Sequence, residues 1–172
     1  MELLERFAQG DLDAFETLFR QFQSAVYGWI VRIVRDRGVA EDLTVETFWR
    51  IYRAHARFDP AGNFGAWARR IATNAALDHL KTARREVALP EDLAAGAQPN
   101  PAVHREVHDR IDRAFRELPA RLQVAATLAL VEEESNEKIA EALGISVGAV
   151  KSRVFRAVRL LRRKLKGLGV EP

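Results

Sequence analysis

Residues 135–166 constrain the fold of this chain more than any other segment. They begin with Ser135-Asn-Glu-Lys-Ile-Ala-Glu-Ala-Leu-Gly144 and continue through Ile-Ser146 into a basic stretch that starts at Val147. Serine is a preferred residue before the first turn of a helix, and glycine is a preferred residue after the last turn. Because Gly144 and Ser146 are only two positions apart, the pattern predicts a helix-turn-helix with a turn of about three residues.

The second of these helices is predicted to be apolar on one side and basic on the other. Between Lys151 and Lys166 there are eight Lys or Arg residues and no acidic residue. Apolar residues recur at helical spacing and predict a buried stripe: Val147, Val150, Val154, Val158, Leu161 and Leu165. The cations then face outward, as expected for a helix in the DNA major groove. The alternative is a helical hairpin whose basic face is merely solvated.

Length and composition exclude several classes of protein. With 172 residues, 48% of them hydrophobic, the chain can form one large domain or two small ones. It has no cysteine, which excludes disulfides and thiolate chemistry. The start lacks the pattern of a secretion signal, and no stretch approaches the roughly twenty apolar residues of a membrane span. We therefore expect a soluble, cytoplasmic protein that does not insert into a membrane.

Helical periodicity dominates the first half of the chain. Asp11 is placed to cap the first long helix, and Gly38 is expected to end it. Two further helices are expected at residues 40–56 and 64–85, with a turn at residues 59–63 between them. All three tryptophans are predicted to pack in the core: Trp29, Trp49 and Trp67.

A proline-rich segment separates this half from the rest. Residues 87–103 contain three of the six prolines and show no sustained periodicity, so residues 87–105 are predicted to be a flexible linker. Beyond it, Val107 to Leu118 form an amphipathic pattern, and Pro119 is well placed to open the next helix. Strand signals are nearly absent. The sequence thus predicts an all-α protein of two small helical domains, at 1–86 and 106–172, whose relative orientation changes with their partners.

Several strings make the chain recognisable when they are taken in order. The N-terminal half contains Ala40-Glu-Asp-Leu-Thr-Val-Glu-Thr-Phe48 and Phe64-Gly-Ala-Trp-Ala-Arg-Arg-Ile-Ala-Thr-Asn74, which runs on to Asp78. The C-terminal half contains Leu143-Gly-Ile-Ser-Val-Gly148 and Val150-Lys-Ser-Arg-Val-Phe-Arg-Ala157. With these strings the chain resembles the extracytoplasmic-function (group 4) sigma factors of the bacterial sigma-70 family. The resemblance implies sigma region 2 before the linker and region 4 after it.

The resemblance also implies a function and partners. Proteins of this type bind core RNA polymerase at the clamp and flap regions of its large subunits, direct it to promoter DNA and help to open the duplex. They perform no bond chemistry, so the chain is expected to be no enzyme and to need no cofactor or metal. An anti-sigma factor is an expected partner, and the free chain is expected to be a monomer.

Roles of individual residues follow from the same resemblance. Asp42 and Glu46 match the helix that docks on the polymerase clamp, although Val45 stands between them where Gln is usual. Six residues match the minus-ten region: Asn63, Asn74, Asp78, Lys81, Arg84 and Arg85. Six more match the helix that faces the minus-thirty-five element: Lys151, Ser152, Arg153, Phe155, Arg156 and Arg159.

Two other classes of protein stay open. A conventional helix-turn-helix regulator would explain the C-terminal half but not the string from Phe64 to Asp78. An enzyme or metal protein is the second alternative, because His104 and His108 lie four positions apart on an expected helix. The sequence specifies no third ligand and no glycine-rich loop that would hold a phosphate.

Overall fold

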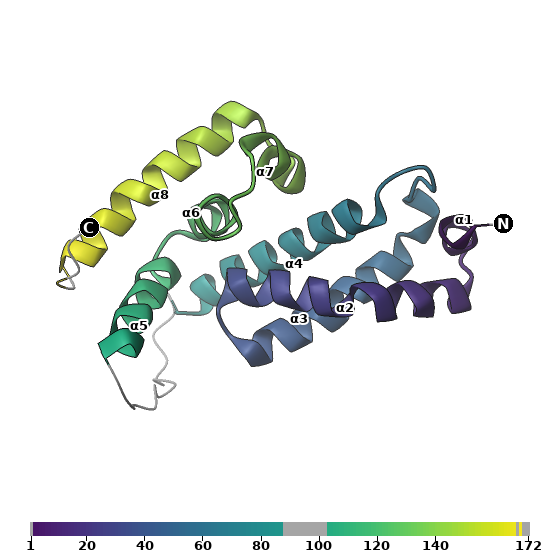
Figure 1. The fold of residues 1–172 in the computed structure, drawn as a ribbon, viewed down its shortest axis with the longest axis horizontal. Helices are drawn as coiled ribbons and strands as arrows, with labels where there is room; N and C mark the ends of the chain where they lie inside the picture. The colour runs from purple at the N-terminus through teal and green to yellow at the C-terminus, as the bar shows by residue number, and fades with distance from the viewer. Residues whose placement is uncertain (1, 88–102, 168, 170–172) are drawn as a thin grey trace.

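The computed structural model describes residues 2–87, 103–167 and 169, and within them the chain forms helices and no strand (Figure 1). The N-terminal half consists of α1 (Leu3–Ala8), α2 (Leu12–Val34), α3 (Arg37–Arg53), a short 3-10 turn (His55–Arg57) and α4 (Phe64–Val87). The C-terminal half consists of α5 (Val103–Arg116), α6 (Ala120–Ala126), the π-helical segment η2 (Thr127–Val131), α7 (Asn136–Leu143) and α8 (Val147–Gly167). The all-α prediction is confirmed. Most of the predicted linker lies outside the described residues.

Short polar side chains fix where the first long helices begin. Asp11 caps α2 as predicted, because its carboxylate accepts a hydrogen bond from the backbone N–H of Ala14 at 3.0 Å. The prediction that Gly38 ends this helix is wrong: α2 ends at Val34, and Arg35 takes the left-handed conformation there with φ of 58°. Asp36 then caps α3, so Gly38 lies in the first turn of that helix. A side-chain cap thus sets this boundary in place of a glycine.

The core of the N-terminal half lies between α2, α3 and α4. Trp29 is buried as predicted, and its indole N–H donates to the hydroxyl of Thr73 at 2.8 Å. Trp67 is half-buried among aromatic rings, with its ring centroid 5.0 Å from that of Phe58.

The prediction that Trp49 packs in the core is wrong, since 55% of its surface is exposed. It follows directly after the buried Phe48, and one step along a helix turns a side chain by about 100°. The face of α3 that packs on its neighbours therefore excludes Trp49.

The helix-turn-helix forms with the predicted caps. The Ser135 hydroxyl accepts from the backbone N–H of Lys138, Gly144 ends α7 in the left-handed conformation with φ of 64°, and the Ser146 hydroxyl accepts from the N–H of Ala149. On α8, Val150 and Leu161 are buried as the predicted stripe requires. This stripe packs on α6 and fixes which side chains of α8 point outward.

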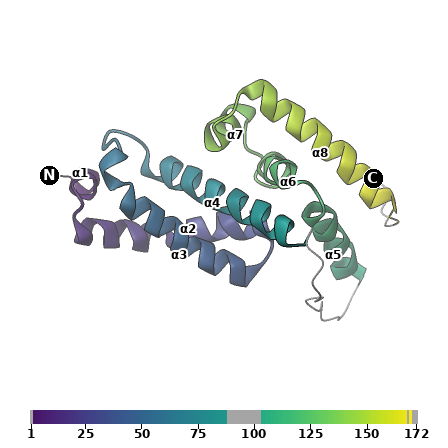
Figure 2. The same ribbon diagram turned by 180° about the vertical axis from the view of Figure 1, so that it is seen from behind.

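The two halves of the chain pack against each other. Figures 1 and 2 show α6 and α7 lying between α4 and α8. Val124 of α6, Leu128 of η2 and Ile139 of α7 are buried in the same apolar cluster as side chains of α2 and α4. A second apolar cluster, which includes Phe115 and Leu161, lies within the C-terminal half. The two sets of helices thus share part of their core.

Candidate nucleic-acid interface

The outward face of α8 carries five of the six residues predicted for the minus-thirty-five element, all of them exposed: Lys151, Ser152, Phe155, Arg156 and Arg159. Phe155 is 64% exposed, and the guanidinium carbon of Arg159 lies 5.9 Å from the centroid of its ring. The buried residues Val150, Ala157 and Leu161 hold the opposite side of the helix against the domain. The face therefore presents cationic, aromatic and hydroxyl side chains to solvent on a fixed backbone.

Arg153 differs from the other five residues because it is only half-exposed. Burial lowers the pKa of its guanidinium, and the nearby positive charge of Arg121 lowers that pKa further. An arginine stays protonated in proteins, so its charge persists at neutral pH. Its predicted role at the minus-thirty-five element stays a prediction.

Four of the residues predicted for the minus-ten region share one side of α4, since they follow one another at spacings of four, three and four positions: Asn74, Asp78, Lys81 and Arg85. Asn74, Asp78 and Arg85 are exposed, and Lys81 is half-buried. The carboxylate of Asp78 accepts from the guanidinium of Arg50 on α3 at 3.1 Å. The exposed Asn74 has room to meet a ligand on this side of the helix.

Asn63 lies at the end of the loop that precedes α4. Its side-chain oxygen accepts from the backbone N–H of Ala66 at 2.9 Å and so caps the start of the helix. The loop residues Asp59 and Asn63 also line a cavity of about 640 Å³, which Lys138 of α7 lines as well. The structure thus places this loop opposite the C-terminal half of the chain.

Arg84 is separated from the other predicted minus-ten residues. It is half-buried, and its guanidinium donates to the backbone carbonyl of Arg116 at 3.1 Å and to the side-chain oxygen of Gln123 at 3.0 Å. Burial lowers its pKa. In this arrangement Arg84 binds the C-terminal half of the chain, while its neighbour Arg85 faces solvent.

The residues predicted for the polymerase clamp lie on an exposed face of α3 that also carries apolar side chains. Asp42 is exposed and Glu46 is half-exposed. At the same helical spacing, Val45 is 69% exposed and Trp49 is 55% exposed. Sequence reasoning missed Trp49, although its four-residue spacing from Val45 is a signal that both lie on one face.

Arg50 is a second residue that sequence reasoning missed. Its guanidinium donates to Glu46 at 2.8 Å and to Asp78 at 3.1 Å, so it joins the predicted clamp face to the predicted minus-ten face. These hydrogen bonds raise the pKa of Arg50, that with Glu46 contributing most. The four-residue spacing from Glu46 to Arg50 was readable in the sequence, but the contact with Asp78 depends on the packing of α3 on α4.

The structure was also searched for metal-binding groups and for helices that could span a membrane. Among residues 2–87, 103–167 and 169, no group of three or more His, Cys, Asp or Glu side chains could hold a metal ion. The side chain of His104 lies outside the described residues, so its pairing with His108 is not described. In the same part of the chain, no helix has the length and apolarity that crossing a membrane requires.

A helical chain with an exposed basic helix-turn-helix in its C-terminal half and an exposed polar face on α4 in its N-terminal half has the features of a two-part DNA-binding protein. The family described as Sigma-70 region 2 matches residues 18–86, and the family described as Sigma-70, region 4 matches residues 108–161. The chain belongs to the sigma-70 family, in its extracytoplasmic-function group, and is a sigma factor that directs RNA polymerase to promoters. The region 2 match accounts for the half that a conventional regulator left unexplained.

Individual relatives agree with this assignment. The chain is 37% identical to the RNA polymerase sigma factor CarQ of Myxococcus xanthus, over 98% of both chains. It is 32% identical to the ECF RNA polymerase sigma-E factor of Haemophilus influenzae, over 96% of this chain and 95% of that one. The fold is similar to that of the sigma factor RpoE from Bartonella quintana, solved in complex with the anti-sigma factor NepR. That similarity has a TM-score of 0.61 at 25% identity and covers 88% of this chain and 96% of the other.

Proposed function

We propose that this sigma factor uses three separate faces in transcription initiation. Helix α3 binds the clamp of core RNA polymerase, α4 and the loop at residues 59–63 read the minus-ten element, and α8 reads the minus-thirty-five duplex. The observation that carries the proposal is the exposed face of α8, where Lys151, Phe155 and Arg156 lie opposite a buried apolar stripe. The domain bounds that go with it are 1–86, 87–105 and 106–172.

The proposed clamp face has the composition of a protein interface. The apolar surface of Val45 and Trp49 forms its centre, and the carboxylates of Asp42 and Glu46 lie beside it. Interfaces commonly combine an apolar centre with a polar rim, and aromatic residues supply much of their affinity. The two carboxylates favour a partner surface that carries cationic groups.

The proposed minus-thirty-five face combines residues that contact base edges with residues that position the protein on the DNA backbone. Arg156 and Lys151 can reach guanine acceptors, and the ring of Phe155 can contact a thymine methyl group. Ser152 can hydrogen bond to either kind of base pair. Arg153 and Arg159 are assigned to phosphates, which fix the register of the protein without reading sequence.

The proposed minus-ten face acts on melted DNA. An asparagine such as Asn74 can form two hydrogen bonds with a base edge, and a base taken out of the stack exposes that edge. Extrusion of a base costs a few kcal/mol, so contacts from neighbouring groups must add to those of Asn74 to offset this cost. Asp78 and Asn63 contribute polar groups, and Lys81, Arg84 and Arg85 contribute cations for phosphates.

Regulation and assembly complete the proposal. The Bartonella quintana RpoE structure, solved with NepR, supports an anti-sigma factor as a partner of this chain. The chain acts in the cytoplasm as a monomer when free, it contacts the flap of the polymerase as well as the clamp, and it contributes no catalytic group or cofactor.

The test is transcription with purified components. The chain is added to bacterial core RNA polymerase with a library of genomic fragments, and core alone is the control. Discrete new start sites are expected, and they would also deliver the promoter sequences. If the chain fails to associate with core but binds specific DNA by itself, the proposal is wrong.

A further inference from the structure

A small cavity lies at the turn between α2 and α3, beside residues of α5 and η2. Its volume is about 270 Å³. The residues that line it are mostly cationic or apolar: Val31, Arg32, Arg35, Arg37, Asp112 and Val131. Because three arginines and one carboxylate belong to this lining, the cavity has an excess of positive charge.

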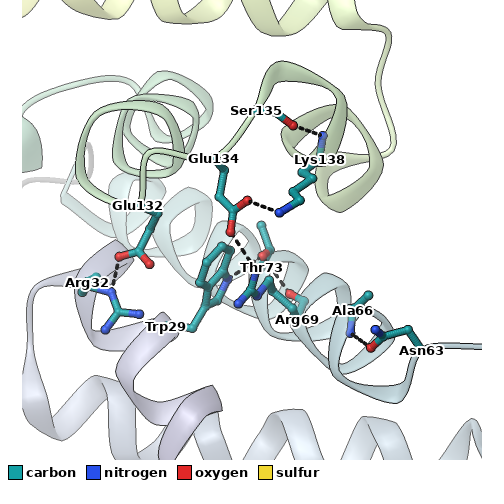
Figure 3. A network of polar contacts seen from close by, with 10 residues as sticks. All are labelled: Trp29, Arg32, Asn63, Ala66, Arg69, Thr73, Glu132, Glu134, Ser135 and Lys138. Carbon is teal, nitrogen blue, oxygen red and sulfur yellow. Dashed lines mark hydrogen bonds and ion pairs between the residues drawn. The ribbon is translucent and has the colours of Figure 1, made fainter.

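Two of the three arginines have acidic partners. Arg32 forms an ion pair with Glu132, the residue after η2, as Figure 3 shows. Arg35 forms an ion pair with Asp112 of α5. Arg37 is exposed, and it forms no ion pair with any residue in the part of the chain that the structure describes. The positive charge of Arg37 is therefore available to a ligand.

Other groups at the turn have little effect on the charge inside the cavity. The carboxylate of Asp36 accepts from the backbone N–H of Val39 at 2.9 Å and so caps α3, and Asp36 does not belong to the lining. The end of α2 and the start of α3 meet here, so the partial negative charge of one helix end and the partial positive charge of the other offset each other. The side chains of the lining thus determine which ligands the cavity attracts.

Arg35 is held more firmly than an ordinary surface arginine. Only 14% of its side-chain surface is exposed, and its guanidinium carbon lies 4.2 Å from the centroid of the Phe115 ring. Its Nε atom is buried and has no hydrogen-bond partner among the described residues. A buried donor without an acceptor is unfavourable, so this guanidinium has unused hydrogen-bonding capacity at a fixed position.

The backbone of Arg35 is also unusual for an arginine. Its φ of 58° lies in the left-handed region, which glycine and asparagine adopt at lower cost. Strain of this kind occurs often at sites where a side chain is held for a function. The ion pair with Asp112 explains part of the arrangement, but it leaves the Nε atom of Arg35 without an acceptor and Arg37 without an acid.

An oxyanion is the kind of ligand that this lining fits. A guanidinium presents its N–H donors in a planar fork that matches carboxylate and phosphate oxygens. Small-molecule sites commonly have volumes of about 300–1,000 Å³. A cavity of about 270 Å³ therefore has room for a compact group and too little for a whole nucleotide. A diphosphate group is compact, carries several negative charges and offers enough oxygens for more than one arginine.

We propose that this cavity binds a small phosphorylated anion through a diphosphate group. We call it the arginine site and define it by Arg32, Arg35, Arg37 and Asp112. Arg35 and Arg37 donate to the phosphate oxygens, Arg32 adds positive charge, and the rest of the ligand extends into solvent beside the exposed Arg32 and Arg37. The proposal goes beyond the proposed function and does not depend on it, because none of these residues is assigned to the clamp or to a promoter element.

Binding of inorganic pyrophosphate to the full chain tests the arginine site. Calorimetric titration at constant ionic strength should show saturable binding, which chloride or sulfate at the same ionic strength does not reproduce. Arg37→Ala should weaken this binding by about tenfold, because it removes a cationic donor of charge-assisted hydrogen bonds from an exposed position. Arg53→Ala is the matched control, since it removes the same charge from an exposed position on the same helix. It should bind pyrophosphate like the parent.

Asp112→Asn should change the affinity in the opposite direction. It removes the carboxylate of the lining but keeps its shape, so the anion meets less repulsion and should bind several-fold more tightly. A thermal unfolding scan establishes that the variant is folded. Unchanged or weaker binding by folded Asp112→Asn would mean that Arg35 serves the ion pair alone, and it would overturn the proposal.

The location of bound pyrophosphate must be measured as well, because the basic face of α8 also attracts anions. Amide NMR spectra of the labelled chain should show saturable shifts at Val31, Arg37 and Val131. Shifts confined to α8, or equal losses of affinity in Arg37→Ala and Arg53→Ala, would show general neutralisation of surface charge and would overturn the proposal.

A short DNA duplex distinguishes a small-molecule phosphate from a phosphate of the DNA backbone. Arg37→Ala should bind the duplex with the affinity of the parent while it loses affinity for pyrophosphate. If Arg37→Ala instead weakens binding to the duplex and leaves binding of pyrophosphate unchanged, the arginines contact DNA and the proposal is wrong.

Discussion

Trp49→Ala tests the clamp face most sharply, because the side chain is large, apolar and mostly outside the core. A whole tryptophan side chain can bury about 250 Å². With 55% of its surface exposed, Trp49 has on the order of 140 Å² to lose to a partner. At about 25 cal/mol per Å² this area corresponds to at most about 3.4 kcal/mol. Since truncation of a central aromatic residue commonly costs 2 kcal/mol or more, we expect a loss of about 2–3 kcal/mol in binding to core polymerase.

This loss corresponds to a dissociation constant raised roughly 30- to 150-fold, measurable by fluorescence anisotropy of the labelled chain titrated with core polymerase in the absence of DNA. Phe155→Ala is the matched control, because it removes another exposed aromatic ring, 64% exposed, from the DNA-reading helix. It should leave binding to core unchanged. Thermal unfolding should show that Trp49→Ala changes the free energy of unfolding by no more than about 1 kcal/mol. Unchanged affinity for core in a folded Trp49→Ala chain would refute the assignment of this face.

Further predictions concern DNA reading, capping and acid stability. Arg156→Ala should cost about 1–3 kcal/mol of DNA-binding free energy at particular base pairs of the minus-thirty-five element. Arg159→Ala should instead weaken binding to all sequences alike and reduce its dependence on salt. Binding to a panel of single-base promoter variants at several salt concentrations separates the two. Ser135→Ala should destabilise the chain by about 1 kcal/mol through loss of the α7 cap, and an unchanged chemical unfolding midpoint would contradict this. The hydrogen bond from Arg6 lowers the pKa of Asp11, so its contribution is present above the unfolded pKa of about 3.9 and is lost as the pH falls through the lower folded value. Asp11→Asn should therefore be the less stable chain near pH 6, and the difference in unfolding free energy should disappear on acidification.

The elements governed by local chemistry were predictable from the sequence. The caps at Asp11, Ser135 and Ser146 form as expected, because each depends on a side chain and a backbone N–H three residues away. The apolar stripe of α8 was readable for the same reason, since helical spacing alone determines which residues share a face. The prediction that Gly38 ends α2 was wrong although glycine is common after a helix. Here Arg35 takes the left-handed conformation after α2, and Asp36 caps the next helix.

The parts that depend on contacts between distant segments were not predictable. Trp49 was assigned to the core because tryptophan is usually buried, but which face of α3 meets α2 and α4 is decided by packing. The hydrogen bond from Arg84 to Gln123 joins residues 39 positions apart, so no periodic pattern in the sequence predicts it. The same holds for the ion pairs of Glu132 with Arg32 and of Glu134 with Arg69, which join residues far apart in the chain.

The double hydrogen bonding of Arg50 has a consequence for energetic linkage between the two faces of region 2. A cation from another protein that approaches Glu46 competes with Arg50 for that carboxylate, and an Arg50 released from Glu46 keeps Asp78 as its acceptor. Binding at α3 and binding at α4 are then thermodynamically coupled, and each event must alter the affinity of the other by the same factor. Because Arg50 and both carboxylates keep between 38% and 59% of their side-chain surface exposed to solvent, the coupling free energy is limited to about 1 kcal/mol.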